Sequence, residues 1–435
     1  MSVLTELHRD IASSRTFHSV GRIKSANGVL TADIPAAIHE QCQVIDRNLS
    51  VMAEVIGFND DAVQIMPYYD LEGLSRDARV IRLEKRSMVP YGPGLLGRVI
   101  DAFGNPMDGK GPLRNCRWNL LEQNIPCPLS RTSINVPFPT GQRTIDGLLT
   151  IGRGQRMGLF AGSGVGKSTL LGEIAKSVET DINVIALIGE RGREVRPFLD
   201  ECLGAKGMER SVVIVATSDQ SSLVRVRAAE TAVSIASQFR SLGQHVLLML
   251  DSITRLAHAQ REIGLVRNEP PTARGYTPSV LRLITKILEA MGNGDVGSIT
   301  GIVTVLVDGD DFNEPISDAV RSIVDGHTVL TREMAQRGHY PAIDVLHSIS
   351  RVARDVISDE HAASAQKIRD MLAIQREMED LIRVGAYVKG SSEKVDKALE
   401  LADAIDALRF QRPGESTPFA QTVNAMKQIA AAWKW

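Results

Sequence analysis

The sequence of 435 residues has few aromatic side chains, few cysteines, no excess of either charge and no long apolar run. Phe, Trp and Tyr make up only 4% of the chain, which leaves few rings on which single-stranded nucleic acid can stack. Lys and Arg number 50 against 52 Asp and Glu, so the formal net charge is −2. A near-neutral chain has no general attraction for nucleic acids or for anionic membrane surfaces.

The cysteines are too few and too scattered for a disulfide framework, and none belongs to a Cys-x-x-Cys pair. We therefore expect a reduced, cytoplasmic protein. The first ten residues lack the basic and apolar segments of a signal peptide. The longest apolar runs, such as residues 246–250, fall far short of the roughly 18 residues that a membrane span needs. Any association with a membrane is expected to be peripheral.

The N-terminal part of the chain predicts a short helix followed by a small β-barrel. Apolar residues recur at helical spacing over residues 1–14, and such a terminal helix either docks on its own domain or is offered to a partner. Short apolar segments between turn signals over residues 19–85 predict the barrel. Small barrels can bind oligonucleotides, but this one has 7 Lys and Arg against 10 Asp and Glu. We therefore expect a structural barrel and no nucleic-acid partner.

The rest of the chain predicts a central α/β domain and a helical C-terminal domain. Residues 86–150 are rich in glycine and proline and indicate a connection with many loops. Apolar runs of strand length then alternate with helical periodicity as far as about residue 350, which is typical of a parallel sheet buried on both faces. The expected strands are 157–161, 184–188, 212–216, 246–250 and 302–307, and the expected C-terminal helices are 362–384, 392–408 and 419–433. We place the parts of this α/β protein at 1–18, 19–85, 86–355 and 356–435.

The strongest motif is Ala161-Gly-Ser-Gly-Val-Gly-Lys-Ser-Thr169, which follows an expected strand and opens an expected helix. This is the setting of a phosphate-binding loop, or P-loop, whose backbone N–H groups and helix N-terminus attract phosphate oxygens. Lys167 is then expected to reach the β- and γ-phosphates, and Ser168 to offer its hydroxyl to Mg²⁺. Ala161 replaces the usual first glycine with another small residue. The expected nucleotide-binding residues are Gly162, Ser163, Gly164, Val165, Gly166, Lys167, Ser168 and Thr169.

Three further segments carry candidate site residues. Asp251 ends the apolar run 246–250, which is the expected partner strand of a phosphate loop, and its carboxylate is expected to hold the Mg²⁺ shell. Glu190 follows another strand and can polarise an attacking water, but a solvated charge cluster explains the segment equally well. Spacing alone assigns no role to the arginine of the segment 338–352.

Taken together, these segments resemble the rotary-type ATPases related to the F-type ATP synthase catalytic subunit. The stretch Thr140-Gly-Gln-Arg-Thr-Ile-Asp-Gly-Leu-Leu-Thr150, which leads to the phosphate loop, carries this resemblance. Within that group, residues 160–171, 307–315 and 325–330 resemble the protein-export ATPases of flagella and type III secretion systems. The stretch Gly385-Ala-Tyr-Val-Lys-Gly-Ser391 looks more like the flagellar branch. The resemblance covers the chain from about residue 20 to about residue 410.

The resemblance implies a RecA-like P-loop ATPase domain that hydrolyses ATP with Mg²⁺ to energise protein export. It implies that Glu190 is the catalytic glutamate and that Arg191 senses the γ-phosphate. It further implies that Arg351 is an arginine finger supplied by the neighbouring subunit and that Tyr340 stacks on the adenine. Arg255 matches an arginine of the family motif Asp-Ser-Ile-Thr-Arg, with its role left open.

The family also implies a homohexamer with its sites at the subunit interfaces. The expected partners are a stator-like regulator bound by the N-terminal helix, a central stalk-like protein, and an export gate at the cytoplasmic face of the inner membrane. Unfolding cargo and its chaperones are expected to meet the helical C-terminal domain. The sequence leaves open the exported substrates and the resting oligomeric state.

Four alternatives are kept open. The export system is either flagellar or a virulence injectisome. A more distant alternative is the catalytic subunit of an ATP synthase, although such a synthase needs a separate non-catalytic subunit and this chain carries both Glu190 and Arg351. A hexameric nucleic-acid translocase or transcription terminator has the same architecture, but the acidic barrel argues against it. A non-catalytic adaptor is disfavoured by the intact Lys167, Asp251 and Glu190.

Overall fold

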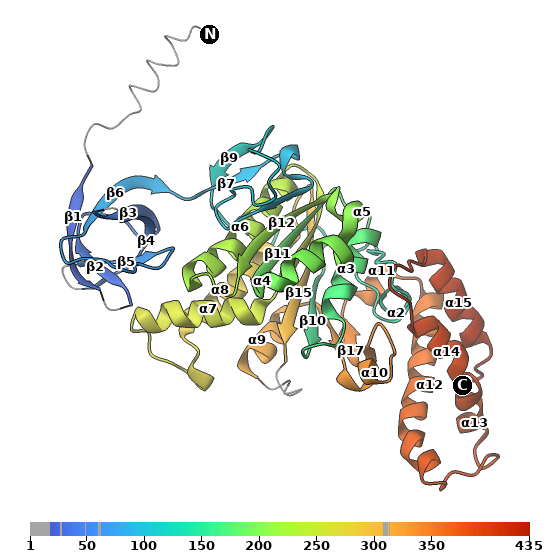
Figure 1. Ribbon diagram of the computed structural model, residues 1–435. Helices are drawn as coiled ribbons and strands as arrows, with labels where there is room; N and C mark the ends of the chain where they lie inside the picture. The colour runs from blue at the N-terminus through green and yellow to red at the C-terminus, as the bar shows by residue number, and fades with distance from the viewer. Residues whose placement is uncertain (1–17, 27, 48, 60–61, 308–311, 313) are drawn as a thin grey trace.

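The computed structural model describes residues 18–26, 28–47, 49–59, 62–307, 312 and 314–435. The predicted helix over 1–14 and most of the stretch 307–315 lie outside these residues. In the described part, a β-barrel, a central sheet flanked by helices and a set of C-terminal helices follow one another along the chain (Figure 1). The predicted fold class is therefore confirmed.

The barrel is closed, with six strands in the order β1-β2-β5-β4-β3-β6. Closure leaves no open sheet edge. Buried and partly exposed residues alternate strictly along β3, because successive side chains of a strand point to opposite faces. The strands are β1 (Val20–Ala26), β2 (Leu30–Asp33), β3 (Glu40–Asp46), β4 (Leu49–Asn59), β5 (Ala62–Pro67) and β6 (Arg79–Arg86).

The central sheet has nine strands, in the order β17-β16-β10-β15-β13-β11-β12-β8 with β14 paired to β15. All its pairs are parallel except β14 with β15 and β16 with β17. The strands are β8 (Arg98–Ile100), β10 (Arg156–Ala161), β11 (Ile182–Glu190), β12 (Ser211–Thr217), β13 (His245–Asp251), β14 (Gly292–Asn293), β15 (Ser298–Leu306), β16 (Gly326–Leu330) and β17 (Ile343–Ser350). A two-stranded sheet of β7 (Met88–Tyr91) and β9 (Arg117–Leu120) lies apart from it.

Two features of this sheet correct the sequence expectation. The connection over residues 86–150 contributes the edge strand β8, which is too short to give a periodic signal. The last strand, β17, is antiparallel to β16. The intervening helix α10 (Arg332–Gln336) has five residues and rises only about 7 Å, too little to carry the chain back along the sheet for a parallel crossover.

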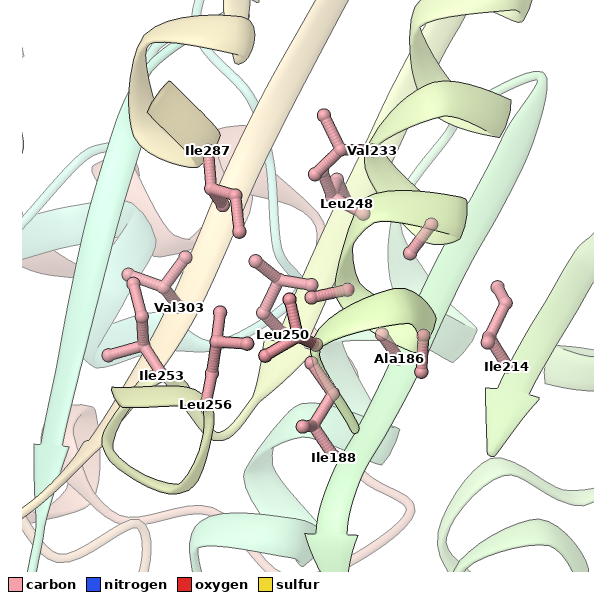
Figure 2. Packing of buried hydrophobic residues seen from close by; sticks show 14 of the residues in the cluster. Ala186, Ile188, Ile214, Val233, Leu248, Leu250, Ile253, Leu256, Ile287 and Val303 are labelled. Atoms are coloured by element: carbon pink, nitrogen blue, oxygen red, sulfur yellow. The ribbon is translucent and has the colours of Figure 1, made fainter. Parts of the chain in front are cut away.

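Helices bury both faces of the sheet. One face packs against α6 (Ser222–Ser241), α7 (Ile253–Val266) and α8 (Pro278–Ala290), where Leu248 and Leu250 lie among Val233, Ile253 and Leu256 (Figure 2). The intervening residues of the same strand, such as Leu247 and Met249, point to the other face and belong to its core together with α3 (Lys167–Ser177). The remaining helices of this domain are α2 (Arg143–Leu148), α4 (Gly192–Pro197), α5 (Gly204–Met208), α9 (Pro315–Ile323) and α11 (Ala353–Val356), with helical turns at Pro93–Leu95, Phe198–Leu203 and Ala273–Gly275.

The C-terminal helices are α12 (Asp359–Arg383), α13 (Glu393–Glu400), α14 (Ala402–Arg409) and α15 (Phe419–Ala431). The helix expected over 392–408 is thus two helices, because Leu401 has φ −88° and ψ 1° and interrupts the helical backbone. The C-terminal helices share a core with α2 and α3 of the central domain. Among the described residues, no helix combines the length and apolarity that crossing a membrane requires.

Candidate active site

The phosphate loop connects β10 to α3, as predicted. Gly164 and Gly166 have φ values of +80° and +88°, a left-handed backbone that side chains other than glycine rarely adopt. Gly166 is the residue that precedes the first turn of α3. Ser168 and Thr169 are exposed on that turn, whereas Val165 is buried. The N-terminus of α3 therefore opens toward solvent with its glycines and hydroxyls in place for an anion.

Parallel strands bring the two predicted carboxylates to the same edge of the sheet as the phosphate loop. Asp251 ends β13 and Glu190 ends the neighbouring β11. The ammonium of Lys167 forms an ion pair with Oδ1 of Asp251 and lies 3.6 Å from Oε1 of Glu190. Thr304 of β15 donates a 2.8 Å hydrogen bond to Asp251. Thr304 was not predicted, since a threonine inside an apolar strand gives no functional signal.

Glu190 is only 8% exposed, and its Oε1 atom is buried without a hydrogen-bond partner in the described structure. Burial, and then the negative charge of Asp251, raise the pKa of Glu190 above its usual value, while Lys167 and Arg255 oppose the shift. A buried carboxylate oxygen without a partner is costly. The unfilled oxygen is therefore placed to accept a hydrogen bond from a water molecule that enters with substrate.

Arg255, whose role the sequence left open, supports Glu190. It lies in the first turn of α7, where its backbone N–H is capped by Ser252. Its guanidinium donates to the carbonyl of Gly189 and lies 3.4 Å from Oε2 of Glu190. Arg255 therefore fixes both the backbone and the carboxylate at the end of β11.

The donor set suits Mg²⁺, which takes oxygen ligands and is commonly held by one or two carboxylates together with substrate phosphates. The buried Asp251 carboxylate and the exposed Ser168 hydroxyl supply such oxygens. The unpartnered Oε1 of Glu190 lies 3.6 Å from the same Lys167 ammonium that pairs with Asp251. The residues present thus fit the ion.

The charged segment after β11 divides into a buried and an exposed part. Glu190 joins the site, but the side chain of Arg191 is 61% exposed and pairs with Glu194 at 3.4 Å. The segment thus has one buried residue beside the phosphate loop and an exposed ion pair, and the water-polarising role of Glu190 stays a prediction. In this chain Arg191 does not contact the cluster formed by Lys167 and Asp251.

Tyr340 lies against the phosphate loop. A Cβ atom built on Gly166 would come within 3.2 Å of Cε1 and 3.3 Å of Cδ1 of the Tyr340 ring. Tyr340 is 39% exposed, so part of the ring is open to a ligand. The structure thus brings together Tyr340, the phosphate loop, Asp251 and Glu190.

Arg351 lies at the opposite edge of the sheet. Its backbone N–H donates to the carbonyl of Asp325, and the Asp325 carboxylate binds Arg156 at the start of β10. The six residues of β10 separate that edge from the phosphate loop by about 20 Å. The exposed Arg351 side chain donates instead to the carbonyl of Arg321. Arg351 therefore cannot reach the phosphate loop of its own chain.

Family models match three consecutive parts of the chain. Residues 29–84 match the beta-barrel domain of the ATP synthase alpha/beta family, and residues 141–350 match the nucleotide-binding domain of that family. Residues 357–428 match the T3SS EscN ATPase C-terminal domain.

Individual proteins match over nearly the full length. The chain is 45% identical to a flagellum-specific ATP synthase of Bacillus subtilis over 413 residues, with 94% of each chain covered. It is 44% identical to a type 3 secretion system ATPase of Xanthomonas euvesicatoria over 429 residues, covering 98% of this chain and 97% of the other. The structure of the assembled ATPase EscN from the type III secretion system of enteropathogenic E. coli superposes with a TM-score of 0.90 at 41% identity, covering 94% of this chain and all of that one. With its predicted fold, its phosphate loop and these relatives, the chain belongs to the family of flagellum-specific ATP synthases and type 3 secretion system ATPases, which are nucleotide-hydrolysing enzymes.

Proposed function

We propose that this type III secretion ATPase hydrolyses MgATP to energise protein export through a flagellar apparatus. The observation that supports the hydrolytic site best is the Lys167 ammonium between Asp251 and Glu190, with Oε1 of Glu190 buried and unpartnered. Purified protein is expected to release phosphate from ATP only when Mg²⁺ is present. A protein that binds ATP without releasing phosphate, under any condition of assembly, contradicts the proposal.

Each residue of the cluster has a role in this reaction. The phosphate loop, residues 162–169, positions the phosphates, and Lys167 neutralises charge on the β- and γ-phosphates. Ser168 and Asp251 would hold Mg²⁺, which would offset the charge of the phosphates. Glu190 orients the attacking water and accepts its proton. Arg255 keeps the Glu190 carboxylate aligned through its contacts with both Gly189 and Glu190.

The other site residues act with the bound nucleotide and with a neighbouring subunit. Tyr340 stacks on the adenine next to Gly166. Arg191 senses the γ-phosphate from the exposed start of α4. Arg351 completes the site of the adjacent subunit in a homohexamer, since it lies at the far edge of its own sheet. Hydrolysis then depends on closure of the interface, which couples chemistry to movement between subunits.

The flagellar assignment is supported by the stretch 385–391, whereas flagellar and type 3 secretion relatives are almost equally similar, at 45% and 44% identity. The test is to delete the gene in the organism that carries it. Loss of flagella with secretion of virulence effectors intact supports the flagellar system, and the reverse supports the injectisome alternative.

The partners are also proposals. We infer a central stalk-like protein along the hexamer axis, and EscN has been solved in complex with its central stalk EscO. We further propose that the protein acts in the cytoplasm, at the export gate on the inner membrane, and that it contacts cargo–chaperone complexes.

For the stator-like regulator, deletion of residues 2–14 is expected to abolish binding and to leave basal ATPase activity. Undiminished binding of the regulator by the truncated protein contradicts this assignment.

The nucleic-acid translocase has a direct test. Hydrolysis by that alternative is stimulated by RNA or DNA, and the stimulation falls steeply with salt. We expect neither nucleic acid to change the rate.

A further inference from the structure

The connector between α14 and α15, residues 410–418, joins the C-terminal helices to the nucleotide site. It runs beside the segment that precedes α2, and the backbone N–H of Thr417 donates to the carbonyl of Gly141 at 3.0 Å. A Cβ atom on Gly141 would clash with Ser416 of the connector and with Ser177 at the end of α3. Gly141 therefore lies between the connector and the C-terminal end of α3, the helix that begins at the phosphate loop.

Gln411 is the central residue of this junction and is only 6% exposed. Its side-chain amide donates to the carbonyl of Gly141 at 3.0 Å and to that of Glu415 at 3.1 Å, and its Oε1 accepts the backbone N–H of Arg143. Its own backbone N–H donates 2.8 Å to the carbonyl of Tyr340. Gln411 thus ties Tyr340 to the start of α2 and to the connector at once.

Arg143 holds the connector in place around Gln411. Its guanidinium donates to the carbonyls of Leu408, at 3.1 Å, and Phe410. It also binds the Glu415 carboxylate and the Thr417 hydroxyl. The Arg143 side chain is 15% exposed, and charge-assisted bonds of this kind are stronger than neutral ones. These four acceptors, three of them in the connector, restrain it more than a single contact does.

The chain of contacts leads to the phosphate loop. Gln411 fixes the backbone of Tyr340, and the ring of Tyr340 lies against Gly166 at the start of α3. The backbone that carries the ring is therefore held by a residue of the C-terminal domain, which the Gln411 side chain in turn anchors to Gly141 and Arg143.

We propose that Gln411, braced by Arg143, is a positioning residue that sets Tyr340 over the phosphate loop and makes nucleotide affinity depend on the C-terminal domain. The inference rests on the proposed function, in which Tyr340 stacks on adenine. Neither Gln411 nor Arg143 touches the reacting phosphates. Their effect is on binding of the nucleotide rather than on the chemical step.

The test is a double-mutant cycle between Gln411 and Tyr340, measured as KM and kcat for ATP and as affinity for a fluorescent ADP analogue. Gln411→Ala and Tyr340→Ala are each expected to raise KM about tenfold with little change in kcat, and the double variant to be no worse than either. If Gln411→Ala folds poorly, two other variants replace it in the cycle. They are Gln411→Met, which keeps the shape of the side chain, and Arg143→Lys.

Arg369→Ala is the matched control. Arg369 also joins α12 to the central domain, through the carbonyls of Leu148 and Val345 at 2.9 Å, but none of its hydrogen bonds goes to Tyr340 or to the connector. It is expected to lower the melting temperature and to leave KM and analogue affinity unchanged.

Two results overturn the inference. One is a rise of KM in the double variant equal to the product of the two single rises, which indicates that the two residues act independently. The other is an equal rise of KM in Arg369→Ala, which indicates general loosening of the junction. A wild-type protein that hydrolyses no ATP contradicts the proposed function instead, and the affinities for the ADP analogue still test the coupling.

Discussion

The Oε1 atom of Glu190 lies 3.6 Å from the Nζ atom of Lys167, close enough for attraction but beyond hydrogen-bond distance. The ammonium is instead bonded to Asp251. Glu190 is thereby held by charge without losing its free oxygen to a protein donor. That arrangement fits a group that must accept a proton from water.

Replacing Glu190 with Gln is expected to lower the rate of phosphate release by about 10²- to 10⁴-fold, the usual contribution of a general base. Binding of a fluorescent ADP analogue is expected to stay close to wild type, since the phosphate loop is unchanged. Glu209→Gln is the matched control, because Glu209 is an exposed glutamate of the same domain. Full turnover by the Glu190→Gln protein contradicts the assignment.

The same substitution is expected to stabilise the protein at neutral pH. Burial and Asp251 raise the pKa of Glu190, so between the unfolded and folded pKa values the folded state binds more protons. The stability that this group contributes is present below the unfolded value, about 4.3, and is lost as pH rises through the folded pKa. Glu190→Gln is therefore expected to melt a few degrees higher than wild type at neutral pH.

The check is a series of melting curves of both proteins from neutral pH downward. The advantage of the variant is expected to shrink as the pH falls. An equal or lower melting temperature for Glu190→Gln at neutral pH contradicts the expectation. The rate of ATP hydrolysis by the wild type is expected to fall over the same acidic range, since only the ionised carboxylate accepts a proton.

Arg351→Ala protein is expected to be inactive alone and to regain part of its activity when mixed with Lys167→Ala protein. A mixed interface then contains one intact phosphate loop and one intact arginine, because Arg351 lies about 20 Å from its own loop. Phosphate release at several mixing ratios measures the recovery. Arg354→Ala, a change at an exposed arginine close by in sequence, serves as the control and is expected to be active alone. Absence of recovery at every ratio argues against a finger supplied by the neighbour.

The barrel is attached to the central domain by a buried ion pair between Arg227 of α6 and Glu54 of β4. The hydroxyl of Tyr68 also donates to Glu54 at 2.8 Å. Arg227→Met is expected to lower the free energy of unfolding by about 3–5 kcal/mol, because it removes the buried, permanently charged partner of Glu54 and leaves only the exposed, titratable His39 as a possible cation beside that carboxylate. Adding Glu54→Gln is expected to restore part of that loss.

Chemical denaturation measures both effects. Arg225→Met is the control, since Arg225 also lies on α6 but pairs with the half-exposed Glu262. Such a pair contributes about 0–1 kcal/mol. Equal losses in Arg227→Met and Arg225→Met contradict the importance of the buried pair.

Local sequence was sufficient to predict the phosphate loop and the fold class. The loop needs glycine at Gly164 and Gly166 because the backbone there has positive φ, which other residues rarely adopt. The strands of the central domain are buried on both faces and therefore appear as continuous apolar runs. Asp251 and Glu190 were predicted at strand ends, and the carboxyl ends of parallel strands meet at one edge.

The sequence by itself thus determined the order of barrel, nucleotide-binding domain and C-terminal helices, and the position of the phosphate loop between β10 and α3. Only the tertiary structure decided that Glu190 is buried while Arg191 is exposed. Glu190 is the last residue of the buried strand β11, and the next residue, Arg191, already lies at the solvent-exposed start of α4. The tertiary structure also placed Arg255 against Glu190, Arg351 at the opposite edge from the loop, and Gln411 beside Tyr340. These contacts join residues that are far apart in sequence, so their geometry is set by how strands and domains pack and by no local pattern.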